Sequence, residues 1–215
     1  MGCRALFAAK TNMNCFYLSN NSHFLWLAPL KVEQLSLEPY LALFHDVIYA
    51  TEMNEMTYIY YLNSHAQLSS SQKSIKVQKN ASDMLNYRIK DMTGLSIEQD
   101  TAFELISHKV AEHNLRHSDS QPAAEQAPKL GDRLATIMFF LNEVPQGGAT
   151  MFPALELTVQ AKKGAALVWH NLNNKLKTDN RVDHLFCSVL VGYKLTLLKY
   201  LHEQPQMLKR PCLRV

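Results

Sequence analysis

The residues best suited to chemistry are a histidine and an aspartate two positions apart, His117 and Asp119. In an extended segment, residues i and i+2 point to the same face, so both side chains can converge on one metal ion. A third ligand must come from elsewhere, and His184 in the β-rich half is the candidate. Two histidines and one carboxylate leave positions open on the ion, which is typical of non-haem Fe(II) oxygen chemistry. The H-x-D triplet alone is a weak signal, because a chain with nine histidines contains such triplets by chance.

A lysine inside an apolar run is the second feature. Lys194 lies in VLVGYKLTLL at positions 189–198, which we expect to be a core strand. A buried ammonium is costly unless an anion pairs with it. Either the side chain extends to the sheet edge and keeps its charge in water, or it binds the carboxylate of a small acidic cosubstrate. His184 and Lys194 are an even number of residues apart, so on one uninterrupted strand they would share a face.

The elements that must position these residues are mixed in the N-terminal half. Residues 1–35 show no clear period, and we predict an irregular arm followed by one domain over residues 36–215. Ala42–Tyr49 is predicted as a strand, and the pattern becomes helical from Glu52. Asp83–Met92 has a helical apolar stripe followed by a capping glycine. The stretch Thr101–Asn114 is ambiguous between helix and strand.

Beyond Gly131 the pattern is that of a β domain. Short apolar runs rich in valine, isoleucine, leucine and aromatic residues are separated by glycine, proline and asparagine turns. These runs are Leu134–Leu141, Leu157–Gln160, Ala165–His170 and Cys187–Tyr200. Strands at this spacing favour a sandwich or jelly roll, and the lack of intervening helices argues against a βαβ fold.

Composition bounds the class of protein. The chain has 215 residues, of which 47% are hydrophobic and 19% charged, as expected of a globular domain. A net charge of +3 is too balanced to indicate a nucleic-acid-binding or membrane-surface protein. No apolar run reaches the length of a membrane helix, and the stretch after Arg4 is too short for an evident signal peptide.

Two blocks of the C-terminal half carry a resemblance to a known family. Gln146–Pro153 reads QGGATMFP, Lys162–Leu172 reads KKGAALVWHNL, and the His184, Cys187 and Lys194 positions follow at matching spacings. The chain thereby resembles the catalytic domain of collagen prolyl 4-hydroxylase α subunits. Three upstream blocks match in order as well, so the resemblance covers nearly the whole chain. These blocks are Leu27–Glu33, Phe44–Val47 and Asp91–Leu95.

The resemblance implies an α+β domain, a double-stranded β-helix (jelly roll) with N-terminal helices. It also implies an Fe(II)- and 2-oxoglutarate-dependent dioxygenase that hydroxylates peptidyl proline, with L-ascorbate to restore iron oxidised in uncoupled turnovers. By position, His117, Asp119 and His184 would hold the iron. Lys194 would pair with the C5 carboxylate of 2-oxoglutarate, with His108 at the place of a second contact. The implied partners are a proline-containing peptide and a disulfide-isomerase-type β subunit.

The four cysteines fit the same family. The resemblance implies a disulfide between Cys187 and Cys212, and a second pair between Cys3 and Cys15. Disulfides would place the protein in an oxidising compartment, the endoplasmic reticulum lumen by analogy. Four free thiols in a cytosolic protein are the alternative.

Two departures from the family leave its activity open. Relatives read NYGxGGxYxxHxD before the metal motif, whereas this chain has His108 at the tyrosine position and no glycine over 107–119. The stretch between Val47 and Asp91 is also shorter than in relatives. A catalytically silent relative that binds a partner is therefore the rival hypothesis. If residues 101–117 were helical, His113 and His117 would instead share a helix face and could bind zinc.

Overall fold

The computed structural model describes residues 3, 14–19, 22–66, 74–77, 83–97, 102–112, 115–121 and 130–206. Within these residues, two α-helices, α1 (Ala50–Ala66) and α2 (Asp83–Thr93), accompany thirteen strands. The strands are β1 (Asn14–Leu18), β2 (Leu30–Ser36), β3 (Leu41–His45), β4 (Ser74–Val77), β5 (Phe103–His108), β6 (Arg133–Phe140), β7 (Gln146–Gly147), β8 (Thr150–Phe152), β9 (Leu157–Val159), β10 (Ala166–His170), β11 (Leu185–Phe186), β12 (Val189–Val191) and β13 (Lys194–His202). Within the described ranges, no helix is both long and apolar enough to cross a bilayer.

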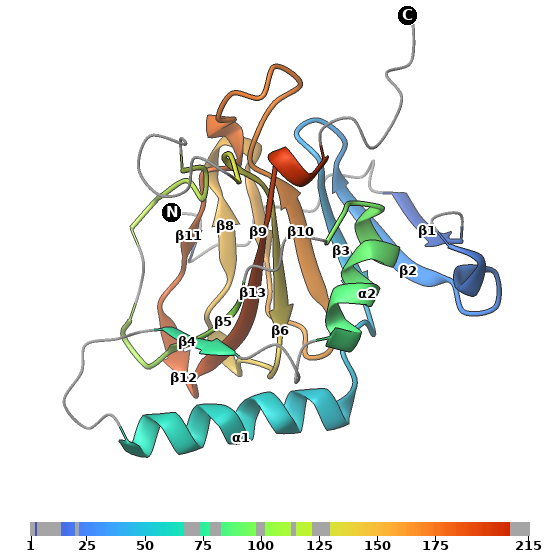
Figure 1. Cartoon of the computed structure of the whole chain (residues 1–215). Coiled ribbons are helices and arrows are strands. Elements are labelled where there is room, and N and C mark those ends of the chain that lie inside the picture. The colour runs from blue at the N-terminus through green and yellow to red at the C-terminus, as the bar shows by residue number, and fades with distance from the viewer. Residues whose placement is uncertain are drawn as a thin grey trace, which may run out of the picture.

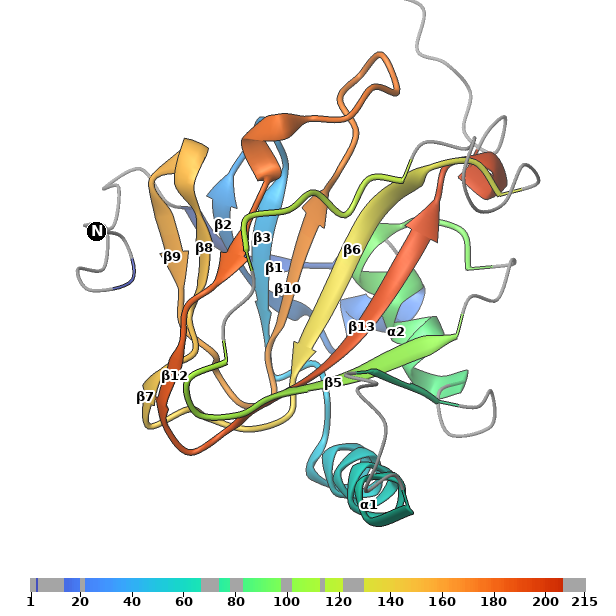
Figure 2. The ribbon, with the colours of Figure 1, turned by 90° about the vertical axis from the view of Figure 1, so that its left-hand side faces the viewer.

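Two layers of antiparallel strands enclose an interior (Figures 1 and 2). The large sheet has the order β1-β2-β3-β10-β6-β13-β5-β4. Facing it are a three-stranded sheet, β11-β8-β9, and the two-stranded pair β12-β7. Strands distant in sequence thus become neighbours, as expected of the predicted jelly roll.

The two faces of the large sheet bury different sets of side chains. On the outer face, Leu85 and Ile89 of α2 and Met56 of α1 pack in one core cluster with Phe44 and Phe139. The helical period predicted over 83–92 therefore marks a buried stripe, as expected. On the inner face, a second cluster fills the space between the sheets, with Trp169, Phe140, Met138 and Phe186 among its members. The candidate site lies on this inner face.

The N-terminal region departs from the sequence prediction. Within the predicted arm, Asn14–Leu18 and most of Leu30–Ser36 form strands, so an irregular arm over residues 1–35 is wrong for these segments. They pair in register with each other, and β2 then pairs with β3. β1 is exposed along most of its length and so lacks the apolar alternation that identifies a half-buried strand.

The ambiguous stretch after Thr101 is a strand. Phe103–His108 pairs with β13 on one side and with β4 on the other. Phe103 and Leu105 point into the outer core, whereas His108 faces inward. The alanine- and glutamate-containing composition suits a helix, so tertiary pairing decides the conformation here.

The predicted cysteine pairing is wrong. Cys187 is bonded to Cys3, and Cys15 is an exposed free thiol. Cys212 lies outside the described residues. The fold brings Cys3 beside the end of β11, and the Cα atoms of Cys3 and Cys187 lie 5.5 Å apart. The disulfide therefore joins residues that are 184 positions apart in the sequence. Four cysteines allow three complete pairings, and sequence spacing does not select among them.

Candidate metal and cosubstrate site

The three residues of the predicted metal triad meet on the inner side of the fold. One ligand atom of each of His117, Asp119 and His184 lies within 4.8 Å of the others. His117 and His184 form an isolated antiparallel bridge, in which each backbone N–H donates to the other residue's carbonyl at 3.0 Å. Because this bridge holds the two histidines side by side, the centres of their rings lie 4.4 Å apart.

Both histidine rings are oriented by backbone carbonyls. Nδ1 of His117 lies 2.9 Å from the carbonyl of Leu115, and Nδ1 of His184 lies 3.2 Å from that of Val182. When Nδ1 donates to these carbonyls, the neutral ring presents the lone pair of Nε2, which is the form that binds a metal. Burial also lowers the pKa of His184 and so favours its neutral form. The Nε2 atoms of His117 and His184 lie 3.8 and 3.9 Å from the carboxylate of Asp119.

The carboxylate is held by a buried polar chain. Thr136 on β6 donates its hydroxyl to Asp119 Oδ2 at 2.8 Å, and the amide of Asn171 donates to the Thr136 hydroxyl at 2.9 Å. Thr136 and Asn171 are fully buried. These hydrogen bonds fix the orientation of the carboxylate, whose Oδ1 faces His117 and whose Oδ2 faces His184, as supporting residues do at metal sites.

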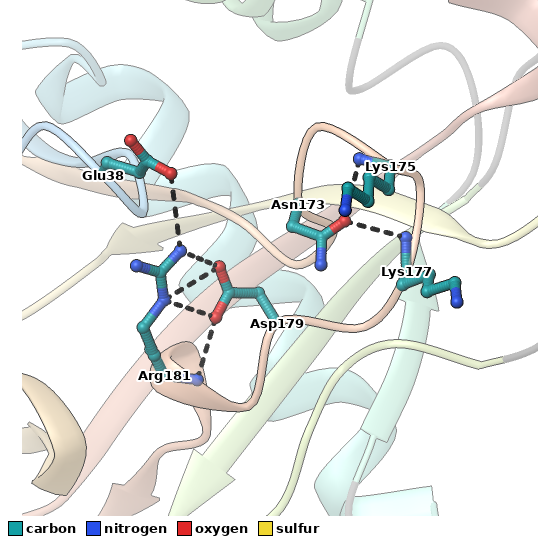
Figure 3. A network of polar contacts seen from close by, with 6 residues as sticks. All are labelled: Glu38, Asn173, Lys175, Lys177, Asp179 and Arg181. Atoms are coloured by element: carbon teal, nitrogen blue, oxygen red, sulfur yellow. Dashed lines mark hydrogen bonds and ion pairs between the residues drawn. The ribbon is translucent and has the colours of Figure 1, made fainter.

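The loop that delivers His184 is braced by its own polar network (Figure 3). Asp179 accepts hydrogen bonds from the backbone N–H and from Nε of Arg181, and it forms an ion pair with Nη2 of the guanidinium at 2.6 Å. The guanidinium keeps the pKa of Asp179 below its usual range. Asn173 closes the preceding turn by accepting from the backbone N–H groups of Lys175 and Lys177. These contacts brace the loop that leads to His184.

The second predicted feature, Lys194, is fully buried on the same inner face. Its Nζ donates to the hydroxyl of Thr150 at 3.0 Å and lies 4.3 Å from the ring centre of Phe186. Among the described residues no carboxylate pairs with it, and burial lowers the pKa of Lys194 to about 7. The lysine does not extend to solvent at the sheet edge. An anion bound at this position would offset the cost of burying the ammonium.

His108 lies directly opposite Lys194. The two residues are register partners on β5 and β13, so their side chains share a face. The His108 ring is buried and packs edge to face against the Phe186 ring, with 4.9 Å between the ring centres. Phe186 also contacts the rings of His117 and His184. One aromatic ring thus links the lysine end of the interior to the metal triad.

His184 and Lys194 reach this interior by different strands. The chain is interrupted between them by β11, β12 and a turn at Gly192, which has a φ of 87°. One continuous strand is therefore not the reason that they converge. The first glycine of the QGGAT block is required for close packing of the backbone. A Cβ on Gly147 would overlap the carbonyl of Ser188, the residue just before β12, with which β7 pairs.

The segment before the metal motif keeps a conformation that favours glycine. Ala111, at a position where relatives have glycine, has a φ of 66° and donates its N–H to the carbonyl of Val189 at 3.0 Å. A side chain there is strained by roughly 1–2 kcal/mol. The zinc hypothesis required a helix through His117, and it is wrong because β5 and the His117 bridge are extended. His113 lies outside the described residues.

Charged and aromatic groups surround the metal triad at its more exposed side. Arg116 and Asp183, each one residue before a triad histidine, form an ion pair at 3.1 Å. The guanidinium of Arg133 stacks on Tyr200 at 3.7 Å. Burial, and to a lesser extent the charge of Asp119, raise the pKa of Tyr200. These groups, together with Thr136, Thr150 and Phe186, were not identified from sequence. Thr150 lies in the QGGAT block, which is the one signal that could have found it.

The chain is similar in sequence to known prolyl 4-hydroxylase subunits. The chain is 31% identical to human prolyl 4-hydroxylase subunit alpha-3 and 30% identical to the Caenorhabditis elegans subunit alpha-2, over 94% of its length in both cases. It spans 40% and 41% of these relatives, about two fifths of their length. No protein-family model matches the chain.

Solved structures show the same fold. The 2OG complex of the viral collagen prolyl hydroxylase of Paramecium Bursaria Chlorella virus-1 aligns with a TM-score of 0.63 at 16% identity, covering 74% of this chain and 93% of that one. A Pseudomonas putida prolyl-4-hydroxylase aligns with a TM-score of 0.54 at 16% identity, covering 76% and 92%. Both support the jelly-roll assignment.

Proposed function

Because the chain is related to the prolyl 4-hydroxylase α subunits, we propose that it is an Fe(II)- and 2-oxoglutarate-dependent dioxygenase that hydroxylates proline in a peptide. The observation that carries this proposal is the joint placement of two features on one inner face. One is a two-histidine, one-carboxylate cluster, and the other is a buried lysine without a carboxylate partner among the described residues. Either feature alone would fit many proteins, but the pair fits an iron site with an acidic cosubstrate.

The donor set fits Fe(II). His117, Asp119 and His184 would hold the ion on one side and leave the other side open. Bound there with 2-oxoglutarate and dioxygen, iron would supply the oxidising chemistry that inserts oxygen into a C–H bond. The residues of this chain hold the site in place: the carbonyls of Leu115 and Val182 orient the rings, and Thr136 orients the carboxylate.

The far carboxylate of 2-oxoglutarate would bind Lys194, with the Thr150 hydroxyl beside it. His108, opposite the lysine, is placed to contact the same carboxylate from β5. An anion at this position would raise the pKa of Lys194 from about 7 and keep the lysine charged. Phe186 and Phe140 lie against the lysine and exclude water from the ion pair, which strengthens it.

The peptide would approach from the side that carries Arg116, Arg133 and Tyr200. Arg116 directly precedes His117, and the charge of Asp119 acts on Tyr200, so both groups lie near the metal triad. L-ascorbate would restore iron after uncoupled turnovers. A disulfide-isomerase-type β subunit and a location in the endoplasmic reticulum lumen belong to the same proposal, which the Cys3–Cys187 disulfide supports.

An anaerobic titration of metal-free protein with Fe(II), followed by 2-oxoglutarate, tests the proposal. Chelation of bound iron by the keto acid gives a visible charge-transfer band, and its saturation gives the affinity. We expect a saturable band that is lost in Asp119→Ala. A folded protein that gives no band would contradict the proposal.

The same titration separates the enzyme from a catalytically silent relative. Two observations favour that second candidate: His108 replaces a phenol with a shorter ring, and Ala111 strains the adjoining backbone. A silent relative would bind neither iron nor 2-oxoglutarate with useful affinity. A live enzyme would bind both and form succinate only when dioxygen is admitted.

A further inference from the structure

Asp132 is a buried carboxylate that the proposed chemistry does not use. It directly precedes β6, and only 8% of its surface is exposed. Within the described ranges its carboxylate is held by hydrogen bonds, without an ion pair to a cation. Burying a carboxylate is costly unless hydrogen bonds satisfy it, so these contacts indicate what the acidic group does here.

The two carboxylate oxygens of Asp132 hold different groups. Oδ1 accepts the backbone N–H of Gln121 at 2.5 Å and that of Arg133 at 2.6 Å. Oδ2 accepts the hydroxyl of Ser120 at 2.6 Å. Ser120 and Gln121 directly follow the triad aspartate in the sequence. Two of the three hydrogen bonds therefore tie the end of the H-x-D segment to the start of β6.

The Ser120 hydroxyl extends this contact to the loop that leads to His184. Its Oγ lies 2.7 Å from the hydroxyl oxygen of Thr178, which belongs to the loop shown in Figure 3. Thr178 also pairs with Leu172 in an isolated antiparallel bridge, which closes this loop. One line of hydrogen bonds therefore runs from Asp132 through Ser120 to the loop that ends at His184.

This line is separate from the polar chain of Thr136 and Asn171. That chain acts on the carboxylate of Asp119 itself, whereas Asp132 holds the backbone that follows it. A metal ligand is placed both by its backbone and by the rotation of its side chain, so the two sets of contacts are complementary.

We propose that Asp132 is a positioning residue of the metal site. Its hydrogen bonds hold the segment that carries His117 and Asp119 in register with the loop that carries His184. This role rests on the proposed function, since it takes the triad to be the metal site. It adds that all three ligands depend for their placement on a carboxylate that is not itself a ligand.

A titration of the metal-free protein with Co(II), followed by visible absorbance, tests this role without depending on turnover. The absorbance gives the affinity and, at saturation, the coordination geometry, which a loss of stability alone would not change. We expect Asp132→Ala to weaken Co(II) binding about 10- to 100-fold and to alter the saturated spectrum. Asp132→Asn should recover most of the affinity, because its Oδ1 still accepts both backbone N–H groups and its amide can donate to the Ser120 hydroxyl.

Asn142→Ala is the matched control at the other end of β6. The Asn142 side chain also holds backbone groups, since it accepts the N–H of Leu195 at 2.8 Å and donates to the carbonyl of Tyr193 at 2.7 Å. Its loss should lower the unfolding temperature and leave the affinity and spectrum of Co(II) unchanged. Ser120→Ala breaks the line at its middle and should weaken Co(II) binding. Combined with Asp132→Ala, it should add less than its separate effect.

Several outcomes would overturn the assignment. Asp132→Ala could bind Co(II) as the unaltered protein does, or lose no more affinity than Asn142→Ala. A loss in Asp132→Asn as large as in Asp132→Ala would show that the charge matters rather than the hydrogen bonds. Should Asp132→Ala fail to fold, unchanged Co(II) binding by Ser120→Ala would overturn it. Failure of the proposed function is distinguishable, because the unaltered protein would then bind Co(II) without giving the Fe(II)–2-oxoglutarate band, whereas a chain that binds no Co(II) overturns both.

Discussion

Replacing Lys194 by methionine should lower the affinity for 2-oxoglutarate and raise the stability of the metal-free protein, so it tests the cosubstrate site by two opposite effects. Methionine keeps the apolar stem and removes the charge, so the fold should tolerate it. A charge-assisted hydrogen bond contributes about 1.5–3 kcal/mol, so the affinity for 2-oxoglutarate should fall roughly 10- to 150-fold. The same change removes a buried ammonium that has no carboxylate partner among the described residues. The metal-free variant should therefore unfold at a higher temperature than the unaltered protein.

Lys199→Met is the matched control for this experiment. Lys199 lies on the same strand and is equally buried, but its Nζ lies over the ring of Phe103 in the outer core. The anaerobic band titration should give an unchanged 2-oxoglutarate affinity for this control. Equal affinity of Lys194→Met and the unaltered protein, or a lower unfolding temperature of Lys194→Met, would refute the assignment.

The protonation of Lys194 adds a pH dependence to the same measurement. With a pKa of about 7 in the empty site, the lysine is charged below that pH and neutral above it. Since the carboxylate binds the charged form, affinity should be level below about pH 7 and fall up to roughly tenfold per pH unit above it. His108 on β5 and the His184 ring also border this interior, so the profile is compared with that of Lys194→Met. In the methionine variant the decline above pH 7 should disappear.

Three further changes test the supporting structure. Thr136→Val removes the donor to the metal carboxylate and should weaken Co(II) binding, measured by absorbance, about 10- to 100-fold. The control is Thr158→Val, because the Thr158 hydroxyl has no partner in the described structure, and it should leave Co(II) binding unchanged. Equal losses of binding in the two variants would contradict the role of Thr136. Cys3→Ser opens the bond to Cys187 and should lower the free energy of unfolding by about 2–5 kcal/mol; a non-reduced peptide map without the Cys3–Cys187 link would contradict the pairing. Ala111→Gly should raise the unfolding temperature by relieving the positive φ, about 1 kcal/mol of stability, and a lower temperature would show that no strain is present.

Predictions from the sequence agree best with the structure where a residue type at its position has one physical explanation. The H-x-D spacing and the lysine in an apolar run identified groups that the fold brings to one inner face. The helical stripe at 83–92 and the short runs after Gly131 also predicted elements close to those observed. In each case local periodicity and burial act together, so the sequence alone contains the signal.

The remaining features depend on long-range contacts. β5 is a strand because β13 and β4 flank it, and β1 is a strand because it adds to the edge of β2. The partner of Cys187 depends on where the first residues of the chain lie, 184 positions away. Thr136 acts on Asp119 from a different strand, and an isolated threonine has no pattern that reveals such a role.

The most direct test of the central claim is turnover in ¹⁸O₂ with a proline-containing peptide, Fe(II), 2-oxoglutarate and ascorbate, followed by mass spectrometry of both products. The proposed dioxygenase should insert one labelled atom into the peptide proline and one into succinate, and Asp119→Ala should do neither. Unlabelled peptide and no succinate from folded, iron-loaded protein would contradict the claim.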